Sequence, residues 1–361
     1  MGERIAVLGA GNGGYALASD LALSGYKVNL FELERFREFN LNPIEEKGGI
    51  ERDGMRSGLA EMDVLTSDIE EALEGAKIVN VTIPAFAHTE FIELMASHLE
   101  GKTVIFFPLN FADVKLRRFI AEKDLGVKAI IAGGETMPYA CRRMKRPAYI
   151  FVRWTFPRTR VAAAPAGDTA RLMESTKGYP INLEPVSSTL EVSMAYENPL
   201  GHIPMMLLNA ASIERTAGKW EIFYDTLVGG KEREGKPQRS QEKLIEAIKH
   251  EQSAVCEKLG FSFEAEPYVG ELPSPAVPWS LDTYWSMTDR MNYRYLTEDV
   301  PYGLVTWASF GDLVGVKTPT LDSCIQISSV LLDRDFKAEG MTVEKLGFGG
   351  MTTKQVVDFF M

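Results

Sequence analysis

The chain has 361 residues, of which 45% are hydrophobic and 25% are charged, and its formal net charge is −11. This length allows two domains with separate cores, and the composition is that of an ordinary globular protein. The acidic balance, without a basic run to follow a phosphate backbone, argues against a nucleic-acid partner, and the apolar runs are too short to predict a membrane span.

The N-terminal segment carries the clearest pattern. Residues 5–8 form an apolar run that leads directly into the sequence GAGNGG at residues 9–14. A helix-like apolar stretch follows at residues 15–23, and a strand-like run at residues 26–31 ends on Glu32. The order of strand, glycine loop, helix, strand and acid predicts a dinucleotide-binding βαβ unit.

Each position of the glycine loop has an expected role in that unit. Gly9 permits the tight turn, Gly11 lets backbone N–H groups approach a pyrophosphate at the helix N-terminus, and Gly14 lets the helix lie close to the strand. Asn12 and Gly13 complete the predicted cofactor-binding loop.

The cofactor is expected to be NAD, with NADP left open. Glu32 lies about 20 residues beyond the loop, where a carboxylate accepts the ribose 2′-OH hydrogen bonds and repels a 2′-phosphate. Arg35 and Arg37 could instead reach a 2′-phosphate, or they are ordinary charges on a solvated helix.

Strand-like and helix-like segments then alternate up to about residue 185. This alternation predicts a doubly wound, Rossmann-type parallel sheet with helices on both faces, and ligands at the rim formed by the carboxyl ends of its strands. Pro84 and Pro108 lie on that rim, where Pro84 either shapes the nicotinamide pocket or simply ends a strand. The pattern predicts a capping box at residues 67–70 and further strands at 78–83, 104–107, 129–132 and 149–152.

An all-helical second domain is predicted at residues 186–361, after a dinucleotide-binding domain at 1–185. Residues 179–185 carry the last predicted strand and the junction. Between the helices lies an aromatic, proline-rich segment, residues 261–295, typical of a loop that lines a substrate cleft. The clearest helical patterns span residues 197–215, 241–259 and 321–332.

Several polar residues have both a chemical and a structural interpretation. His202 is either a core histidine or a proton donor and acceptor, and it would share a helix face with Asn198. Arg294 is either a surface charge or a bidentate anchor for a substrate carboxylate. Asp299 either begins a helix or orients His202 as the acid of a triad does. Glu135 either contacts a second substrate or caps a turn.

The remaining reactive side chains indicate no metal site. Cys141, Cys256 and Cys324 are far apart in the sequence, which argues against a disulfide framework and suits a reducing cytosol. The four histidines lack metal-ligand spacing. Four aromatic residues either close a substrate pocket or pack between the domains: Trp279, Tyr284, Trp285 and Tyr293.

Over essentially its whole length, the chain resembles the octopine/nopaline (opine) dehydrogenase family. The resemblance is sharpest in the N-terminal half at GAGNGG (9–14), VTIPA (81–85), GET (134–136) and CR (141–142). It continues at NPLGH (198–202), LLNAA (207–211), RY (294–295), EDV (298–300), KTPT (317–320) and EKLG (344–347). The family often has proline directly after the histidine, whereas here Ile203 follows and Pro204 comes next.

The resemblance implies an enzyme that uses NAD(P)H to reduce the imine formed between an amino acid and a 2-oxo acid, often pyruvate. It implies that His202 and Asp299 transfer the proton and that Arg294 binds the oxo-acid carboxylate. We expect the nicotinamide to face the cleft between the domains, and the enzyme to be cytoplasmic and able to form a homodimer.

Two alternatives stay open at this point. Ketopantoate reductase and glycerol-3-phosphate dehydrogenase share the layout but typically use a catalytic lysine on the interdomain helix, and residues 189–217 contain none. The third interpretation is an NAD(H)-sensing protein without catalysis.

Overall fold

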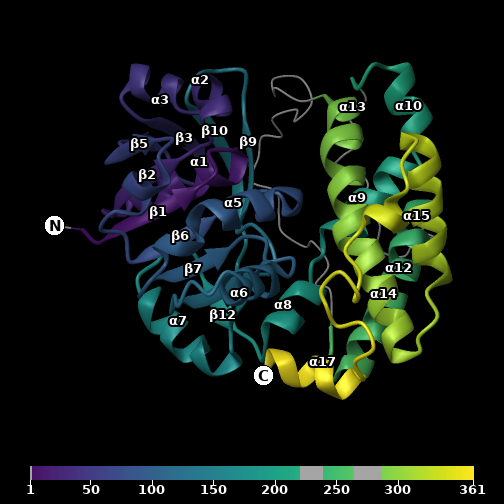
Figure 1. The fold of residues 1–361 in the computed structure, drawn as a ribbon. Helices are drawn as coiled ribbons and strands as arrows, with labels where there is room; N and C mark the ends of the chain where they lie inside the picture. The colour runs from purple at the N-terminus through teal and green to yellow at the C-terminus, as the bar shows by residue number, and fades with distance from the viewer. Residues whose placement is uncertain (1, 220–238, 264–285) are drawn as a thin grey trace. The chain divides into compact units, whose positions relative to one another are not determined.

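The computed structural model describes residues 2–219, 239–263 and 286–361, which form two compact units (Figure 1). The first unit comprises Met1–Ser193 with Phe360–Met361, and the second comprises Met194–Phe359. The segment between residues 185 and 193 therefore packs with the first unit. The reason is that Thr189 donates a hydrogen bond of 2.7 Å to buried Asp113, and Ser193 accepts one of 3.1 Å from the backbone of Phe111.

The first unit is built on an eight-stranded sheet of the predicted Rossmann type. Six consecutive strands, β8, β7, β6, β1, β2 and the edge strand β5, run parallel to one another. On the other side of β8, β11 pairs with it antiparallel. The strands, in sheet order, are β12 (Leu183–Pro185), β11 (Thr159–Ala164), β8 (Ile130–Gly134), β7 (Thr103–Phe106), β6 (Ile78–Val81), β1 (Arg4–Leu8), β2 (Lys27–Phe31) and β5 (Val64–Thr66).

Both faces of this sheet are buried, as a mostly parallel sheet requires. Along β1, Ile5 and Val7 enter one hydrophobic core, whereas Ala6 and Leu8 enter another on the opposite face. The helices of this unit are α1 (Asn12–Leu23), α2 (Arg37–Asn40), α3 (Asn42–Lys47), α4 (Ile69–Leu73), α5 (His88–Met95), α6 (Ala112–Glu122), α7 (Thr169–Ser175) and α8 (Thr189–Met194).

A second sheet, which the sequence pattern did not predict, lies against α1. Its strands, in order, are β4 (Gly58–Ala60), β3 (Ile50–Gly54), β10 (Tyr149–Thr155) and β9 (Tyr139–Arg143). The predicted strand at residues 149–152 belongs here and not to the main sheet. Helix α1 contacts all four strands as well as β1 and β2. Because α1 is covered from two sides, it is apolar nearly all round.

One predicted cap shifts by a residue. The helix expected after residues 67–70 is α4, but its N-cap is Asp68, whose carboxylate accepts from the backbone N–H groups of Glu70 and Glu71. Aspartate caps a helix as well as serine does, and its charge also suits the helix N-terminus.

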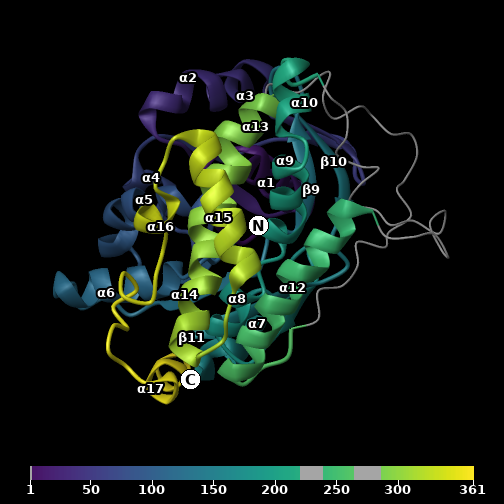
Figure 2. The same cartoon turned by 90° about the vertical axis from the view of Figure 1, so that its right-hand side faces the viewer.

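Every regular element in the described residues of the second unit is a helix, as predicted. Figures 1 and 2 both show α9, α12, α14 and α15 side by side, and these helices contact one another. The helices are α9 (Asn198–Leu207), α10 (Ala210–Arg215), α12 (Ser240–Leu259), α13 (Met287–Arg290), the π-helix η6 (Met291–Leu304), α14 (Val305–Val314), α15 (Pro319–Leu332), α16 (Phe336–Glu339) and α17 (Thr353–Phe360).

Two of the helical predictions need correction. The single helix expected at residues 197–215 is divided into α9 and α10 at Leu208 and Asn209, where the Asn209 side chain donates to the carbonyl of Met205. The loop expected at residues 261–295 ends earlier, because residues 287–304 are helical and bury apolar side chains such as Met291 and Leu296.

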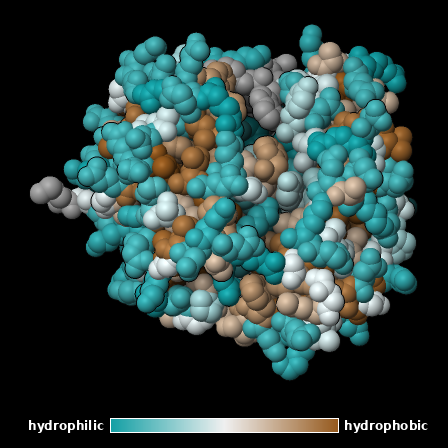
Figure 3. Space-filling model, in the orientation of Figure 1, coloured by the Kyte–Doolittle hydropathy of each residue, from teal (hydrophilic) through white to brown (hydrophobic). Residues whose placement is uncertain are grey.

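The face of the molecule shown in Figure 3 is mainly polar. Hydrophilic side chains cover most of the face shown in Figure 3, with smaller hydrophobic areas between them. In the described part of the chain, no helix is long and apolar enough to cross a membrane.

Candidate active site

The glycine loop joins β1 to α1. It leaves space for an added Cβ at Gly11 but none at Gly14. Gly9 has φ = +96°, a conformation that favours glycine. A Cβ on Gly14 would collide with the carbonyl oxygen of Gly9, whereas a Cβ on Gly11 would meet no atom within 4 Å. Because Gly11 lies at the N-terminus of α1 and opens into free space, the loop fits a bound pyrophosphate.

Glu32 lies directly after β2 and is 6% exposed. Its Oε2 accepts hydrogen bonds from the backbone N–H of Ala10 at 3.0 Å and from Asn40 at 2.8 Å, and its Oε1 accepts from the backbone N–H of Leu33 at 2.9 Å. Arg143 donates to the Asn40 side chain and lies over the ring of Tyr15. The carboxylate is therefore fixed beside the glycine loop.

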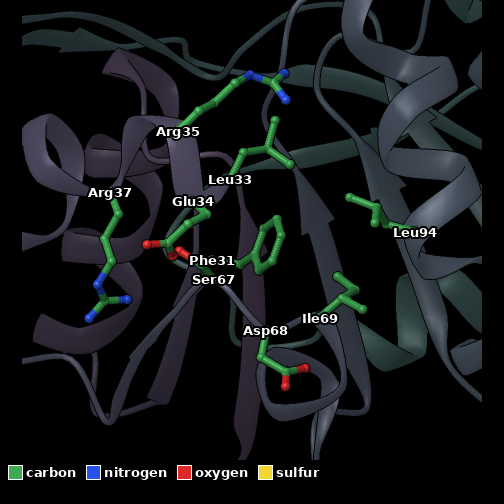
Figure 4. A pocket seen from close by; sticks show the side chains of 9 residues that line it. All are labelled: Phe31, Leu33, Glu34, Arg35, Arg37, Ser67, Asp68, Ile69 and Leu94. Carbon is green, nitrogen blue, oxygen red and sulfur yellow. The ribbon is translucent and has the colours of Figure 1, made fainter.

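A pocket of about 790 Å³ opens beside the end of β2. In Figure 4 the side chains of Phe31, Leu33, Ile69 and Leu94 turn toward a common space. The remaining lining residues are Glu34, Arg35, Arg37, Ser67 and Asp68. A pocket of mixed apolar and polar lining, next to Glu32, suits the adenosine half of a dinucleotide.

The two arginines of this pocket each have a carboxylate partner. Arg35 pairs with Glu90 on α5 at 2.5 Å, and Arg37 pairs with Glu45 on α3 at 2.5 Å. Both ion pairs are partly exposed, so each contributes little to the stability of the fold. Each arginine can therefore exchange its carboxylate partner for another anion.

The other residues predicted in the first unit lie around the loop or on its rim. Asn12 begins α1, and its Oδ1 accepts from the backbone N–H of Arg143 at 2.8 Å. Gly13 lies beneath Met137, whose sulfur would be 2.7 Å from an added Cβ. Pro84 follows β6 and precedes the short helix η2 (Ala85–Ala87).

Glu135 follows β8 and is held by Arg160. The Nε–H of Arg160 donates to Oε2, and its backbone N–H donates to Oε1 at 3.1 Å. Burial raises the pKa of the Glu135 carboxyl, while Arg160 acts in the opposite direction.

In the second unit, α9 and η6 bring His202 and Asp299 together. His202 Nδ1 lies 2.6 Å from Asp299 Oδ2, although the two residues are 97 positions apart in the sequence. The Asp299 side chain is 1% exposed and that of His202 is 17% exposed. Since the carboxylate can only accept, Nδ1 carries the hydrogen and Nε2 is the nitrogen that can exchange a proton.

Two tyrosines complete the surroundings of this pair. Tyr196 donates to Asp299 Oδ1 at 2.5 Å, and Asn198 donates to the Tyr196 hydroxyl at 3.2 Å. The ring of Tyr295 stacks on the imidazole of His202, with 3.9 Å between centroids and 25° between planes. These contacts fix both the carboxylate and the ring.

The π-helix η6 supplies Tyr295 and Asp299 to this site. Its backbone bonds run from residue i to i+5, as from the N–H of Val305 to the carbonyl of Val300, and π-helical geometry is frequent at functional sites. Arg294, one residue before Tyr295, forms an ion pair with fully buried Glu298. Asp299 thus lies inside a helix rather than at the start of one.

Sequence reasoning did not assign roles to Tyr196 and Glu298. Tyr196 stands two residues before Asn198, but nothing in the local pattern links its hydroxyl to a carboxylate 103 positions away. Of the aromatic residues expected to close a pocket, Tyr293 is 65% exposed, while Trp279, Tyr284 and Trp285 lie outside the described residues.

The described residues contain no cluster of three His, Cys, Asp or Glu side chains able to hold a metal ion. The three cysteines are buried and reduced, and burial raises the pKa of Cys141 and of Cys324 to about 11.

Known proteins share both parts of this chain. The family model for the α-helical domain of NAD/NADP octopine/nopaline dehydrogenase matches residues 185–332, and the model for the N-terminus of NAD-dependent glycerol-3-phosphate dehydrogenase matches residues 4–109. An opine dehydrogenase of Arthrobacter sp. (strain 1C) is 30% identical over 355 residues, 96% of each chain. Protein ocs of Agrobacterium tumefaciens (strain Ach5) is 25% identical over 371 residues, 98% of each chain.

A solved structure supports the fold. Octopine dehydrogenase in complex with NADH and L-arginine has a TM-score of 0.64 to this chain at 19% identity, and the match covers 98% of this chain and 97% of that one. This similarity confirms the predicted Rossmann-type sheet followed by a helical domain.

Proposed function

Because the chain belongs to the octopine/nopaline (opine) dehydrogenase family of NAD(P)-dependent oxidoreductases acting on CH–NH bonds, we propose that His202 and Asp299 are its proton-transfer pair. The reaction is the reductive condensation of an amino acid with a 2-oxo acid, for which pyruvate is our first candidate. The observation that supports these roles is the 2.6 Å contact between a nearly inaccessible carboxylate and a partly accessible imidazole.

The dinucleotide is held by the first unit. Gly9, Gly11, Asn12, Gly13 and Gly14 form the pyrophosphate loop. Glu32 holds the adenosine ribose, and Pro84 borders the nicotinamide. When bound, the reduced nicotinamide supplies the hydride. The carboxylate at residue 32 favours NAD over NADP.

The chain's own contribution to the chemistry is proton transfer. The amine of the amino acid attacks the oxo-acid carbonyl and forms a carbinolamine. Cationic His202 donates the proton from Nε2 to the hydroxyl that leaves as water, and Asp299 stabilises the cation at Nδ1. In the oxidative direction, neutral His202 accepts the proton of the secondary amine.

Arg294 anchors the carboxylate of the 2-oxo acid. Its guanidinium has five N–H donors, more than the single Glu298 carboxylate can use, and the ion pair with buried Glu298 fixes its orientation. Glu135 and Asn198 are our candidates for contacts to the amino acid.

Two further proposals concern the whole protein. A location in a reducing cytosol is supported by three buried cysteines without a disulfide. A homodimer is supported by the exposed apolar side chains Ile327, Val330 and Leu331 on α15. Light scattering of the purified protein tests the homodimer.

The test of the function is to follow NADH absorbance with pyruvate and a panel of amino acids, and to repeat it with NADPH. His202→Ala should lower turnover by about 10²–10⁴ while NADH binding persists, as expected for a lost acid–base group. His250→Ala, which removes an exposed histidine on α12, is the matched control and should behave as wild type. Near wild-type activity of His202→Ala would exclude the assignment.

A wild-type protein that binds NADH but converts no amine and oxo-acid pair would favour an NAD(H)-sensing role. Reduction of an oxo acid without any amine would point instead to a ketopantoate reductase-like reaction.

A further inference from the structure

Among the described residues, two side chains form hydrogen bonds with the carboxylate of Asp299. Oδ2 faces His202 at 2.6 Å, and Oδ1 accepts from the hydroxyl of Tyr196 at 2.5 Å. Tyr196 and Asp299 are each 1% exposed, and the His202 side chain is 17% exposed. In such surroundings a hydrogen bond to a charged group is stronger than at a surface.

The direction of the Tyr196 hydrogen bond is determined by its neighbour. Asn198 Nδ2 donates to the hydroxyl oxygen at 3.2 Å, so this oxygen acts as an acceptor there. The single hydroxyl proton is therefore directed at Asp299. Burial and then the Asp299 charge raise the pKa of Tyr196 well above its ordinary value, against the effect of Arg294, so Tyr196 stays a donor at working pH.

We propose that Tyr196 is a positioning residue that sets the proton affinity of His202 through Asp299. The proposal rests on the function assigned to the His202 and Asp299 pair. Asn198, Tyr196, Asp299 and His202 form a continuous chain of hydrogen bonds that begins and ends on α9.

The single negative charge of Asp299 is shared between two partners, Tyr196 and His202. The Tyr196 hydroxyl stabilises part of the carboxylate charge, which leaves less of it to stabilise an imidazolium at His202. Without this hydroxyl, His202 is the remaining hydrogen-bond partner of the buried carboxylate among the described residues. The imidazolium then gains stability, and His202 holds its proton to a higher pH.

The other charged groups on the elements that pack against α9 have partners of their own. On η6, Glu298 pairs with Arg294, and the surroundings of Tyr302 are Arg334 and Glu339. On α12, the Glu251 carboxylate accepts from the backbone N–H of Thr320 at 2.8 Å.

The remaining groups on these helices also point elsewhere or reach solvent. Gln252 on α12 donates to the carbonyl of Met194, and Asp322 on α15 pairs with Lys337 at 3.8 Å. The other charged side chains of α12 and α15 are at least partly exposed.

The experiment is an NMR titration of the His202 imidazole in the full-length, substrate-free enzyme, in wild type and in Tyr196→Phe. The His202 signal is identified by its absence in His202→Asn. We expect the titration midpoint to rise by about one pH unit in Tyr196→Phe, and the acidic limb of the kcat/KM profile for amine oxidation to move in the same direction. An unchanged midpoint overturns the proposal.

A matched control removes a partly buried hydroxyl of the first unit. The Tyr179 hydroxyl accepts a hydrogen bond of 3.1 Å from Asn80, whereas the hydrogen-bonded residues around His202 belong to the second unit, so Tyr179→Phe should leave the midpoint unchanged. A shift as large as that of Tyr196→Phe would make the effect a general result of losing a buried hydroxyl and would refute the proposal.

A second variant covers the case in which Tyr196→Phe does not fold. Asn198→Ala removes the donor that polarises the Tyr196 hydroxyl, and it should raise the midpoint in the same direction by a smaller amount. Because the titration needs no substrate, it tests Tyr196 even if wild type converts no amine and oxo-acid pair. If wild type converts no such pair, the proposed function is contradicted, but the proposal for Tyr196 is not.

Discussion

Two glycines of the same loop should respond in opposite ways to the addition of one methyl group. Gly11→Ala places a Cβ where no atom lies within 4 Å, so the methyl group enters the space assigned to the pyrophosphate. Gly14→Ala places a Cβ against the carbonyl oxygen of Gly9 and 2.9 Å from its carbonyl carbon, so the backbone must move. We therefore expect Gly11→Ala to impair cofactor binding and Gly14→Ala to impair folding.

The magnitudes follow from local geometry. Gly11 has φ = −78° and is the N-cap of α1. Alanine there reduces the entropy of the unfolded chain, which stabilises by about 0.4–1 kcal/mol, but it is a poorer N-cap by roughly 0.5–1 kcal/mol, so the two effects nearly cancel. At Gly14, forcing a methyl group into close-packed backbone should cost about 1–3 kcal/mol or more, against a gain of about 1 kcal/mol in helix propensity.

Urea unfolding and NADH fluorescence titration measure the two effects separately. Gly11→Ala should keep the unfolding free energy of wild type within about 1 kcal/mol and raise the Kd for NADH at least about tenfold. Gly14→Ala should unfold at a lower urea concentration. If Gly11→Ala binds NADH as tightly as wild type, the space at Gly11 does not hold the pyrophosphate. If Gly14→Ala is as stable as wild type, the backbone contact at Gly14 does not limit folding.

Three further changes have equally definite expectations. Arg294→Lys should raise the KM for the oxo acid by about tenfold or more with little effect on NADH binding, because a point charge cannot replace the guanidinium fork; an unchanged oxo-acid dependence in steady-state assays would exclude Arg294 as the anchor. Glu251→Ala removes the carboxylate that accepts from the backbone N–H groups of Thr320 and Leu321 at the start of α15. It should lower the unfolding free energy measured in urea by about 1–2 kcal/mol. Glu246→Ala, at an exposed position of α12, is the control and should not lower it. Burial lowers the pKa of Lys115 from 10.5 to about 8, so above pH 8 the folded protein has released a proton that the unfolded chain still binds. The stability of wild type relative to Lys115→Met should therefore rise between about pH 8 and 10.5, and parallel stability curves for the two proteins would contradict this.

The central strands β1, β2, β6, β7 and β8 of the main sheet could be predicted from sequence because they are short apolar runs bounded by glycine, proline or the acid Glu32, whereas β5 and β11 were not predicted. The second sheet could not be predicted, since β3 has the sequence IERDG and its pairing depends on strands about 100 residues away. Arg52 on β3 is only 2% exposed, and its guanidinium donates to the carbonyl of Ala16 and lies 3.6 Å from Asp20. A buried arginine of this kind has no signature in local sequence.

The residues of the candidate site also differ in how far they could be predicted from sequence. The glycine loop and Glu32 lie within one supersecondary unit, so their spacing alone indicates a common role. His202 and Asp299 come from helices far apart in sequence, so residue chemistry gave their pairing only as one of two interpretations, and the family resemblance favoured it. The resemblance did not extend to Tyr196, because its contact with Asp299 depends on how α9 packs against η6.

The i to i+5 ladder of η6 has a consequence for how this protein can change over evolutionary time. Tyr295 must meet the face of the imidazole while Asp299 meets its edge, and this register holds only for a fixed number of residues between them. Inserting or deleting one residue would rotate everything beyond it by roughly a quarter of a turn or more and carry the carboxylate off the ring. Length variation is therefore forbidden in this stretch, and new substrate preferences have to arise by substitution here or by remodelling of other segments.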